Sequence, residues 1–224
     1  MTSPASSQRR GATPALAAAF VVAAALAACG GATSAIPTIP PATATPGSGN
    51  GCPTSQPAPL PAGETRTVTI NTSLGAISLK IEGALSPIAA GNFVALAECG
   101  FYDGVVFHRA ATLQDGTPFV IQGGDPSGNG SGGPGYAIQD EPVTASYQRG
   151  TLAMARTSQP NSQGSQFFIV LSDEAGGILA SYNTYAIFGS VASGMEVADA
   201  IYAAADAELP SNPVVMDSVT VANP

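Results

Sequence analysis

The feature that most constrains the fold of this chain is a series of short strand-like segments separated by glycine-rich turns. The series begins with residues 67–70 and 76–81, in which apolar and polar residues alternate on either side of the turn-like residues 71–75. Alternation with a period of two is typical of a half-buried β-strand, so these segments predict a β-hairpin. Further strand candidates lie at residues 105–109, 119–122, 151–155, 166–171, 185–191 and 214–221.

Only two segments of the same region have the apolar spacing of an amphipathic helix. Ser86 and Pro87 suit the N-cap and the first position of the first helix, and Gly100 suits its end. Residues 194–206 repeat apolar side chains at helical spacing and predict the second helix. Many short strands combined with two helices predict a mainly β protein, most simply a closed antiparallel β-barrel.

The N-terminal segment is typical of an export signal. Arg9 and Arg10 precede an uncharged apolar stretch that ends in small residues directly before Cys29. Residues 26–29, Leu-Ala-Ala-Cys, also resemble a bacterial lipobox, which implies cleavage after residue 28 and attachment of a lipid to the Cys29 thiol. The alternative is an ordinary signal peptide followed by an incidental cysteine. The sequence leaves open whether the route is Sec or twin-arginine export.

Residues 29–63 consist mainly of Ala, Thr, Pro, Gly and Ser and show no hydrophobic period. Such a composition buries too little apolar area to offset the entropy of an ordered chain, so it predicts a flexible tether. Three parts follow: a lipoprotein signal peptide at 1–28, the tether at 29–63 and one globular domain at 64–224. The predicted location is outside the cytoplasm, on a membrane that the protein reaches through its lipid alone.

Charge and composition exclude several classes of function. The formal net charge is −8, which disfavours binding to nucleic acid because phosphate recognition needs clustered Lys and Arg. A single histidine excludes metal sites that need two or more histidines. Cys52 and Cys99 remain once Cys29 is assigned to lipid, and in an exported protein they either form a disulfide or stay separate thiols.

Five ordered segments of the domain carry a more specific pattern. They are residues 100–109 (GFYDGVVFHR), 119–125 (FVIQGGD), 128–133 (GNGSGG), 154–169 (MARTSQPNSQGSQFFI) and 185–189 (YAIFG). Together they resemble the cyclophilin family of peptidyl-prolyl isomerases. The resemblance implies a closed eight-stranded antiparallel β-barrel capped by two α-helices, and a protein that is usually monomeric. It also implies an isomerase that acts on X-Pro bonds of exported, unfolded proteins and assists their folding without a cofactor or metal.

The resemblance assigns the two central roles to Arg109 and Gln122. Isomerisation breaks no covalent bond, so it needs no nucleophile; it needs a donor aimed at the prolyl nitrogen, which regains its lone pair when the imide twists. Arg109 matches the family's donor, and a guanidinium suits the task because it stays charged and carries several fixed donors. Gln122 matches the glutamine that orients this arginine and contacts the substrate backbone.

The other matched positions would bind the substrate. They are the proline-pocket positions Phe119, Val120 and Phe168, the rim position Gln166, the groove positions Gly130, Ala155 and Arg156, and the further candidates Leu179 and Tyr185. Taken singly, the apolar members would be assigned to the core. The resemblance implies that Arg156 contacts substrate through its backbone.

The chain departs from the family pattern at several of these positions. The family often has Met at the position of Val120 and Asn at that of Arg156, and its Trp-Leu pair before the last segment is absent. Leu179 is the candidate for the pocket leucine, and Tyr185 stands where many eukaryotic members have His. Val120 and the missing Trp support the alternative function, a catalytically weak peptide-binding or chaperone module on the same fold.

Two other features invite a functional reading that the sequence does not favour. His108 is the single histidine, but the reaction needs no proton transfer, so we expect a barrel histidine with satisfied hydrogen bonds. Residues 128–133 partly imitate a phosphate-binding glycine loop. They lack the following Lys-Ser/Thr and the strand-to-helix context of such loops.

Overall fold

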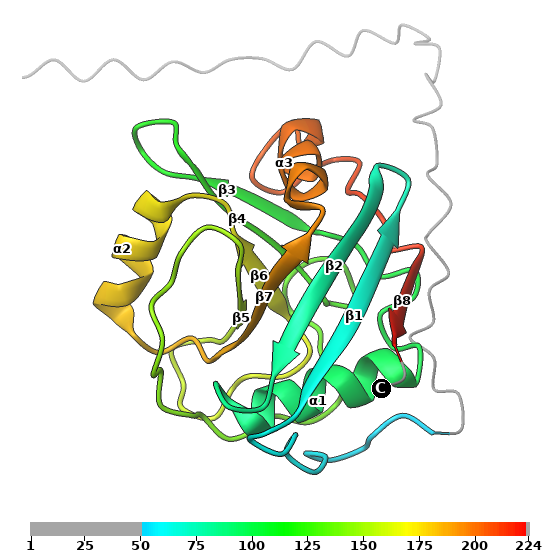
Figure 1. Cartoon of the computed structure of the whole chain (residues 1–224). Coiled ribbons are helices and arrows are strands. Elements are labelled where there is room, and N and C mark those ends of the chain that lie inside the picture. Colours follow the sequence, from blue (N-terminus) through cyan, green and yellow to red (C-terminus); the bar gives the residue numbers. More distant parts are fainter. Residues whose placement is uncertain (1–50, 223–224) are drawn as a thin grey trace, which may run out of the picture. The chain divides into compact units, whose positions relative to one another are not determined.

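The structure is a computed structural model that describes residues 51–222 (Figure 1). The predicted signal peptide, Cys29 and most of the predicted tether lie outside the described residues. Eight strands and three helices occur in the described part. The strands are β1 (Thr65–Thr72), β2 (Gly75–Glu82), β3 (Arg109–Thr112), β4 (Pro118–Gly123), β5 (Thr151–Met154), β6 (Phe167–Val170), β7 (Ile187–Ser193) and β8 (Ser218–Val221). The helices are α1 (Pro87–Glu98), α2 (Asp173–Tyr182) and α3 (Met195–Ala204).

All eight strands belong to one antiparallel sheet, in the order β3-β4-β6-β5-β7-β2-β1-β8, that curls into a half-barrel. The predicted eight-stranded antiparallel architecture is confirmed. Closure differs from the expectation, because the edge strands β3 and β8 do not form a ladder with each other. An isolated bridge between Val106 and Val215 lies beside this seam. The strand predicted at 105–109 differs in its bounds, since β3 begins only at Arg109 and continues to Thr112.

The middle strands of the sheet are buried on both faces, and successive residues pack into two different apolar clusters. Along β6, Phe167 and Ile169 join the main core inside the barrel, whereas Phe168 and Val170 join a smaller cluster that includes Leu179 of α2. This division follows from the alternation of side chains along a strand. The smaller cluster forms the apolar floor of the site described below.

Helix α1 begins where the sequence predicts it, but its first turn is capped by a distant residue. Ser86 occupies the N-cap position without a capping hydrogen bond from its side chain. Instead the Glu141 carboxylate accepts hydrogen bonds from the backbone N–H groups of Ile88 and Ala89, each at 2.8 Å. A carboxylate at a helix N-terminus satisfies free N–H groups and interacts favourably with the helix dipole.

The prediction of two helices was wrong, because α2 is a third. Adjacent glycines, Gly176 and Gly177, weaken the local helix signal of this segment. The local capping signals are nevertheless complete: the Ser172 hydroxyl accepts from Ala175 N at 3.2 Å, and Asn183 ends the helix with a φ of 46°. Gly176 is needed where it stands, because a Cβ there would collide with the backbone oxygen of Tyr147.

Residues 51–63, which composition assigned to the tether, pack on the domain. Leu60 is only 6% exposed, and its backbone N–H donates to Pro87 O at 2.9 Å. Cys52 and Cys99 form a disulfide with their Cα atoms 5.2 Å apart, which attaches this segment to the end of α1. The disulfide and the buried Leu60 hold this otherwise polar segment against the domain, so the packed part of the chain begins before Glu64. Within residues 51–222, no helix has the length and apolarity needed to cross a membrane.

Candidate active site

One row of the sheet places the two central candidates side by side. In the register of β3, β4 and β6, Arg109 lies opposite Gln122, and Gln122 lies opposite Phe168. Residues directly opposite in antiparallel strands have their side chains on the same face. The Arg109 Nη1 group donates to Gln122 Oε1 at 3.3 Å. The row therefore joins a cation, an amide and an aromatic ring on the face that carries the smaller apolar cluster.

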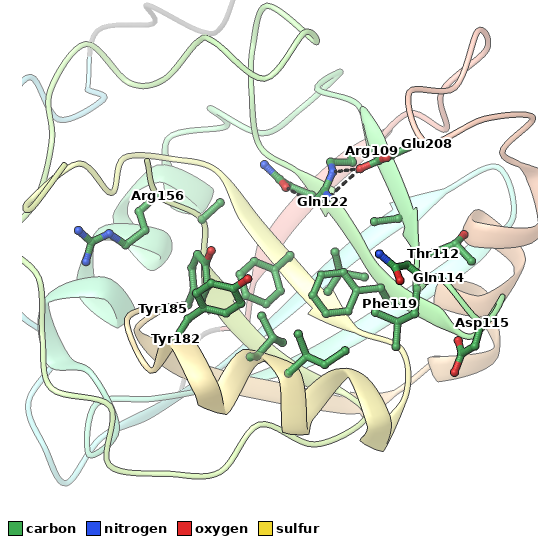
Figure 2. A pocket seen from close by; sticks show the side chains of 17 residues that line it. Arg109, Thr112, Gln114, Asp115, Phe119, Gln122, Arg156, Tyr182, Tyr185 and Glu208 are labelled. Carbon is green, nitrogen blue, oxygen red and sulfur yellow. Dashed lines mark hydrogen bonds and ion pairs between the residues drawn. The ribbon is translucent and has the colours of Figure 1, made fainter. Parts of the chain in front are cut away.

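A pocket of about 830 Å³ opens over this row (Figure 2). Its apolar floor is built by Phe119, Val120 and Phe168, of which Val120 and Phe168 are almost completely buried. Arg109 and Gln122 stand at one side of the pocket (Figure 2). The site residues expected from the sequence all line this pocket apart from Gly130 and Gln166.

Gly130 and Gln166 line an adjoining pocket of about 440 Å³ that shares Gln122 with the first. A chain of hydrogen bonds connects the two pockets. Gln122 Nε2 donates to Gln166 Oε1 at 2.9 Å, and Gln166 Nε2 donates to the carbonyl oxygens of Gly130 and Gly132, each at 2.9 Å. The amide of Gln122 is thus fixed with its oxygen toward Arg109 and its nitrogen toward Gln166.

Helix α2 and the segment after it form another wall of the pocket. Leu179 is 3% exposed and belongs to the cluster beneath the pocket, so the structure places it where the sequence expected a pocket leucine. The ring of Tyr185 meets that of Phe168 edge to face, with centroids 5.5 Å apart. Tyr147 supports this wall by donating its hydroxyl to Tyr185 O at 2.7 Å. Burial raises the pKa of Tyr147 to about 12, so this phenol remains a donor at neutral pH.

Arg156 lines both pockets, but its guanidinium is committed elsewhere. Nη1 forms an ion pair with Asp140 at 3.0 Å, while Nε and Nη2 donate to the carbonyl oxygens of Thr157 and Gln159. Figure 2 shows this side chain directed away from Arg109. The two arginines of the site therefore differ in availability, because Arg156 holds its own loop.

His108 lies behind the site and lines neither pocket. It is 4% exposed, and its only hydrogen-bonding neighbour of note among the described residues is the Val106 backbone, so the ring nitrogens do not show the well-formed hydrogen bonds that the sequence led us to expect. Burial is the main cause that lowers the pKa of His108, although the Asp125 charge opposes it. The imidazole is therefore neutral at pH 7.

The glycine loop at 128–133 is organised by Asp125. Its carboxylate is fully buried and accepts from the backbone N–H groups of Ser127 at 2.7 Å, Asn129 at 3.0 Å and Gly130 at 2.5 Å. Burial alone would raise the pKa of Asp125, but these bonds and the Ser127 hydroxyl outweigh it and leave the pKa below its ordinary value. The loop's N–H groups thus serve an internal anion, and a Cβ at Gly132 would collide with the same carboxylate.

The sequence did not identify several residues that line the main pocket. They are Ala111, Thr112, Leu113, Gln114, Asp115, Ile178, Tyr182 and Glu208. Glu208 contacts Arg109 directly: its Oε1 accepts from Nε at 2.7 Å and forms an ion pair with Nη2, also at 2.7 Å (Figure 2). No local pattern marks Glu208, which lies 99 residues from Arg109 in the chain.

The arrangement offers one kind of chemistry plainly. A guanidinium with several N–H donors stands beside an aromatic and aliphatic pocket, and an amide network fixes the neighbouring polar groups. Such a site can hold a small apolar ring and direct hydrogen bonds at an atom attached to it. Within residues 51–222, no three His, Cys, Asp or Glu side chains cluster as metal ligands would.

Comparison with known proteins gives concordant matches. A family model described as cyclophilin type peptidyl-prolyl cis-trans isomerase/CLD matches residues 67–221. Peptidyl-prolyl cis-trans isomerase-like 3 of Dictyostelium discoideum is 37% identical over 166 residues, covering 70% of this chain and 97% of that protein. Peptidyl-prolyl cis-trans isomerase A of Mycobacterium tuberculosis is 37% identical over 178 residues, covering 70% and 92%.

Solved structures agree with the sequence matches. A crystal structure of a cyclophilin type peptidyl-prolyl cis-trans isomerase from Cryptosporidium parvum superposes with a TM-score of 0.62 at 31% identity, covering 72% of this chain and 100% of that one. A second C. parvum structure, determined in the presence of the dipeptide Ala-Pro, gives a TM-score of 0.60 at 31% identity, covering 70% and 99%.

Proposed function

Because this chain belongs to the cyclophilin family and is a peptidyl-prolyl cis-trans isomerase, we propose that Arg109 is its catalytic donor. The observation that carries this proposal is the place of the guanidinium, beside Gln122 at the side of an apolar pocket floored by Phe119 and Phe168. Arg156 is the other basic residue that lines this pocket, and its guanidinium is bound to its own loop.

The reaction determines what such a donor must do. Rotation about a peptide bond costs roughly 18–20 kcal/mol because amide resonance is lost. In the twisted transition state the prolyl nitrogen is pyramidal and carries a localised lone pair. An N–H of Arg109 that reaches this lone pair stabilises the transition state more than the planar ground state, which is the requirement for catalysis.

The apolar pocket holds the pyrrolidine ring while the rest of the substrate rotates. Phe119, Val120 and Phe168 present a dry surface of the right chemistry for a proline side chain, and Leu179 and Tyr185 close the other side. Gln122 positions Arg109 and offers its amide to the substrate backbone. A C. parvum relative whose structure was determined in the presence of Ala-Pro supports this choice of occupant.

We further propose that the isomerase acts on exported proteins from a lipid anchor at Cys29. The support lies in the sequence: two arginines, an apolar stretch and a lipobox-like Leu-Ala-Ala-Cys ending at residue 29. The disulfide between Cys52 and Cys99 is also typical of an oxidising compartment outside the cytoplasm. The substrates would be proline-containing segments of proteins that fold there.

Two experiments test these proposals separately. A protease-coupled assay on a short Ala-Pro peptide compares wild type with Arg109→Ala, and we expect kcat/KM to fall about 100-fold. Arg66→Ala is the matched control, because Arg66 pairs with Glu64 and lines neither pocket. An unchanged rate for Arg109→Ala would refute the catalytic role.

The anchor is tested by fractionating cells that express wild type or Cys29→Ala, combined with mass spectrometry of the mature N-terminus. We expect wild type in the membrane fraction with a lipid-modified Cys29, and loss of both in the variant. A mature wild-type protein without lipid would refute the anchor and leave the isomerase assignment intact.

A further inference from the structure

Glu208 forms the closest polar contact of Arg109, from a segment that the family pattern did not single out. Its Oε1 accepts from Nε of Arg109 at 2.7 Å and forms an ion pair with Nη2 at the same distance, whereas Gln122 accepts from Nη1 at 3.3 Å (Figure 2). We propose that Glu208 is a positioning residue that sets the orientation of the Arg109 guanidinium. This inference rests on the catalytic role proposed for Arg109.

Counting donors shows what this contact leaves free. A guanidinium has five N–H donors in one plane. Glu208 uses the Nε donor and lies within ion-pair distance of Nη2, and Gln122 uses one donor on Nη1. One N–H on Nη1 and both on Nη2 make no hydrogen bond within residues 51–222. Because the two partners bind different edges of the plane, they restrict rotation of a side chain that is otherwise long and flexible.

The segment that carries Glu208 is itself attached to the strand of Arg109. The carbonyl oxygen of Glu208 accepts from Ala110 N at 2.8 Å, next to Arg109 in the chain. Nearby, Asp206 Oδ1 accepts from Ser211 N at 2.9 Å and closes the loop on itself. The backbone thus presents the carboxylate at a fixed place relative to β3, and a side-chain substitution leaves this backbone bond in place.

A purely stabilising role does not account for the contact. The Glu208 side chain is 59% exposed and that of Arg109 is 33% exposed. Ion pairs with this much exposure contribute little to folding stability, because solvent screens them and ordering two long side chains costs entropy. What the contact does supply is orientation, and misplacement of a catalytic group by about 1 Å can cost as much as 100-fold in rate.

The test uses the full-length protein in the isomerase assay with separate measurement of kcat and KM. For Glu208→Ala we expect kcat to fall about tenfold with little change in KM, because the donor acts in the transition state. Glu208→Gln should retain most of the activity, since its amide oxygen can accept the same hydrogen bond from Nε. Glu98→Ala, an exposed acidic residue at the end of α1, is the control and should behave as wild type.

A double-mutant cycle separates positioning of Arg109 from any other effect. In an Arg109→Ala background, adding Glu208→Ala should cause no further loss. Equal losses in both backgrounds would overturn the proposal, as would full activity of Glu208→Ala. Failure of the underlying assumption looks different: Arg109→Ala would then itself keep its activity. Thermal unfolding of each variant checks that the fold is retained, and we expect unchanged midpoints.

Discussion

Arg109 and Gln122 are direct cross-strand partners in β3 and β4, and their side chains meet at 3.3 Å between Nη1 and Oε1. The same register places Phe168 of β6 opposite Gln122. A shift of one residue in the β3–β4 pairing would send Arg109 to the other face of the sheet. The polar and apolar halves of the site are therefore set by one property, the strand register.

The Gln122 amide is expected to matter through Arg109 and Gln166, which it connects. Gln122→Ala should lower kcat/KM about tenfold, because one of the two groups that orient the guanidinium is lost. The measurement is the protease-coupled assay with an Ala-Pro peptide. Gln148→Ala, an exposed glutamine that lines neither pocket, should match wild type. Equal activities of both variants would contradict a role for the amide network.

Helix α2 offers a matched pair of adjacent glycines. A Cβ at Gly176 would collide with the Tyr147 carbonyl oxygen, whereas a Cβ at Gly177 meets nothing within 4 Å. Gly176→Ala should displace the helix that carries Leu179 and so raise KM and lower the unfolding temperature. Gly177→Ala should leave KM unchanged and stabilise the helix by up to about 1 kcal/mol. Denaturant unfolding and steady-state kinetics test both variants. A Gly176→Ala variant with unchanged KM and unchanged stability would show that the contact with Tyr147 does not fix the position of α2.

Reduction of the Cys52–Cys99 bridge should destabilise the domain. The bridge closes a loop with a sequence separation of 47. A loop of this length corresponds to roughly 4 kcal/mol in the chain-entropy description. The midpoint of urea unfolding should therefore fall on addition of dithiothreitol, and the double variant Cys52→Ser/Cys99→Ser should be insensitive to it. A midpoint that reductant does not alter in wild type would contradict the bridge.

The lowered pKa of the buried His108 predicts that folding stability depends on pH. Burial lowers its pKa in the folded protein from the ordinary value of 6.5, so the unfolded chain binds the proton first as pH falls. Its stabilising contribution is then fully present above about pH 6.5 and is progressively lost as the pH falls from there toward the folded-state pKa. The free energy of unfolding, measured by denaturant between about pH 7 and pH 5, should fall with acidification.

His108 is the single histidine, so one variant provides the control. In His108→Gln this pH dependence should largely disappear, whatever the absolute stability of the variant. The titration of Asp125 lies outside this pH range. Its pKa is lowered, so its contribution to folding stability falls only below about pH 4. A slope that is identical in wild type and variant would assign the effect to other groups.

Local patterns were sufficient for much of the fold. Alternation predicted the β1–β2 hairpin, and Ser86 with Pro87 marked the start of α1. Patterns failed where a tertiary contact reversed a local signal. The glycine pair in α2 weakens the local helix signal, and only the fold shows that Gly176 packs against the Tyr147 carbonyl oxygen. Leu60 lies in a linker-like segment, but in the fold it is buried and its N–H donates to Pro87 O at the start of α1.

The sequence by itself pointed to a large part of the site, because five ordered segments carried every predicted position except Leu179. Residue pattern alone did not separate the two faces of the buried strands; the resemblance assigned Phe168 to the pocket, and the tertiary structure places it there. In the apolar run of β6, Phe167 and Phe168 are chemically identical, and the curl of the sheet sends one to the core and the other to the pocket. Glu208 could be found only from the tertiary structure. Nothing near it in the chain predicts a contact with Arg109, and the contact forms because the segment before β8 folds back along β3.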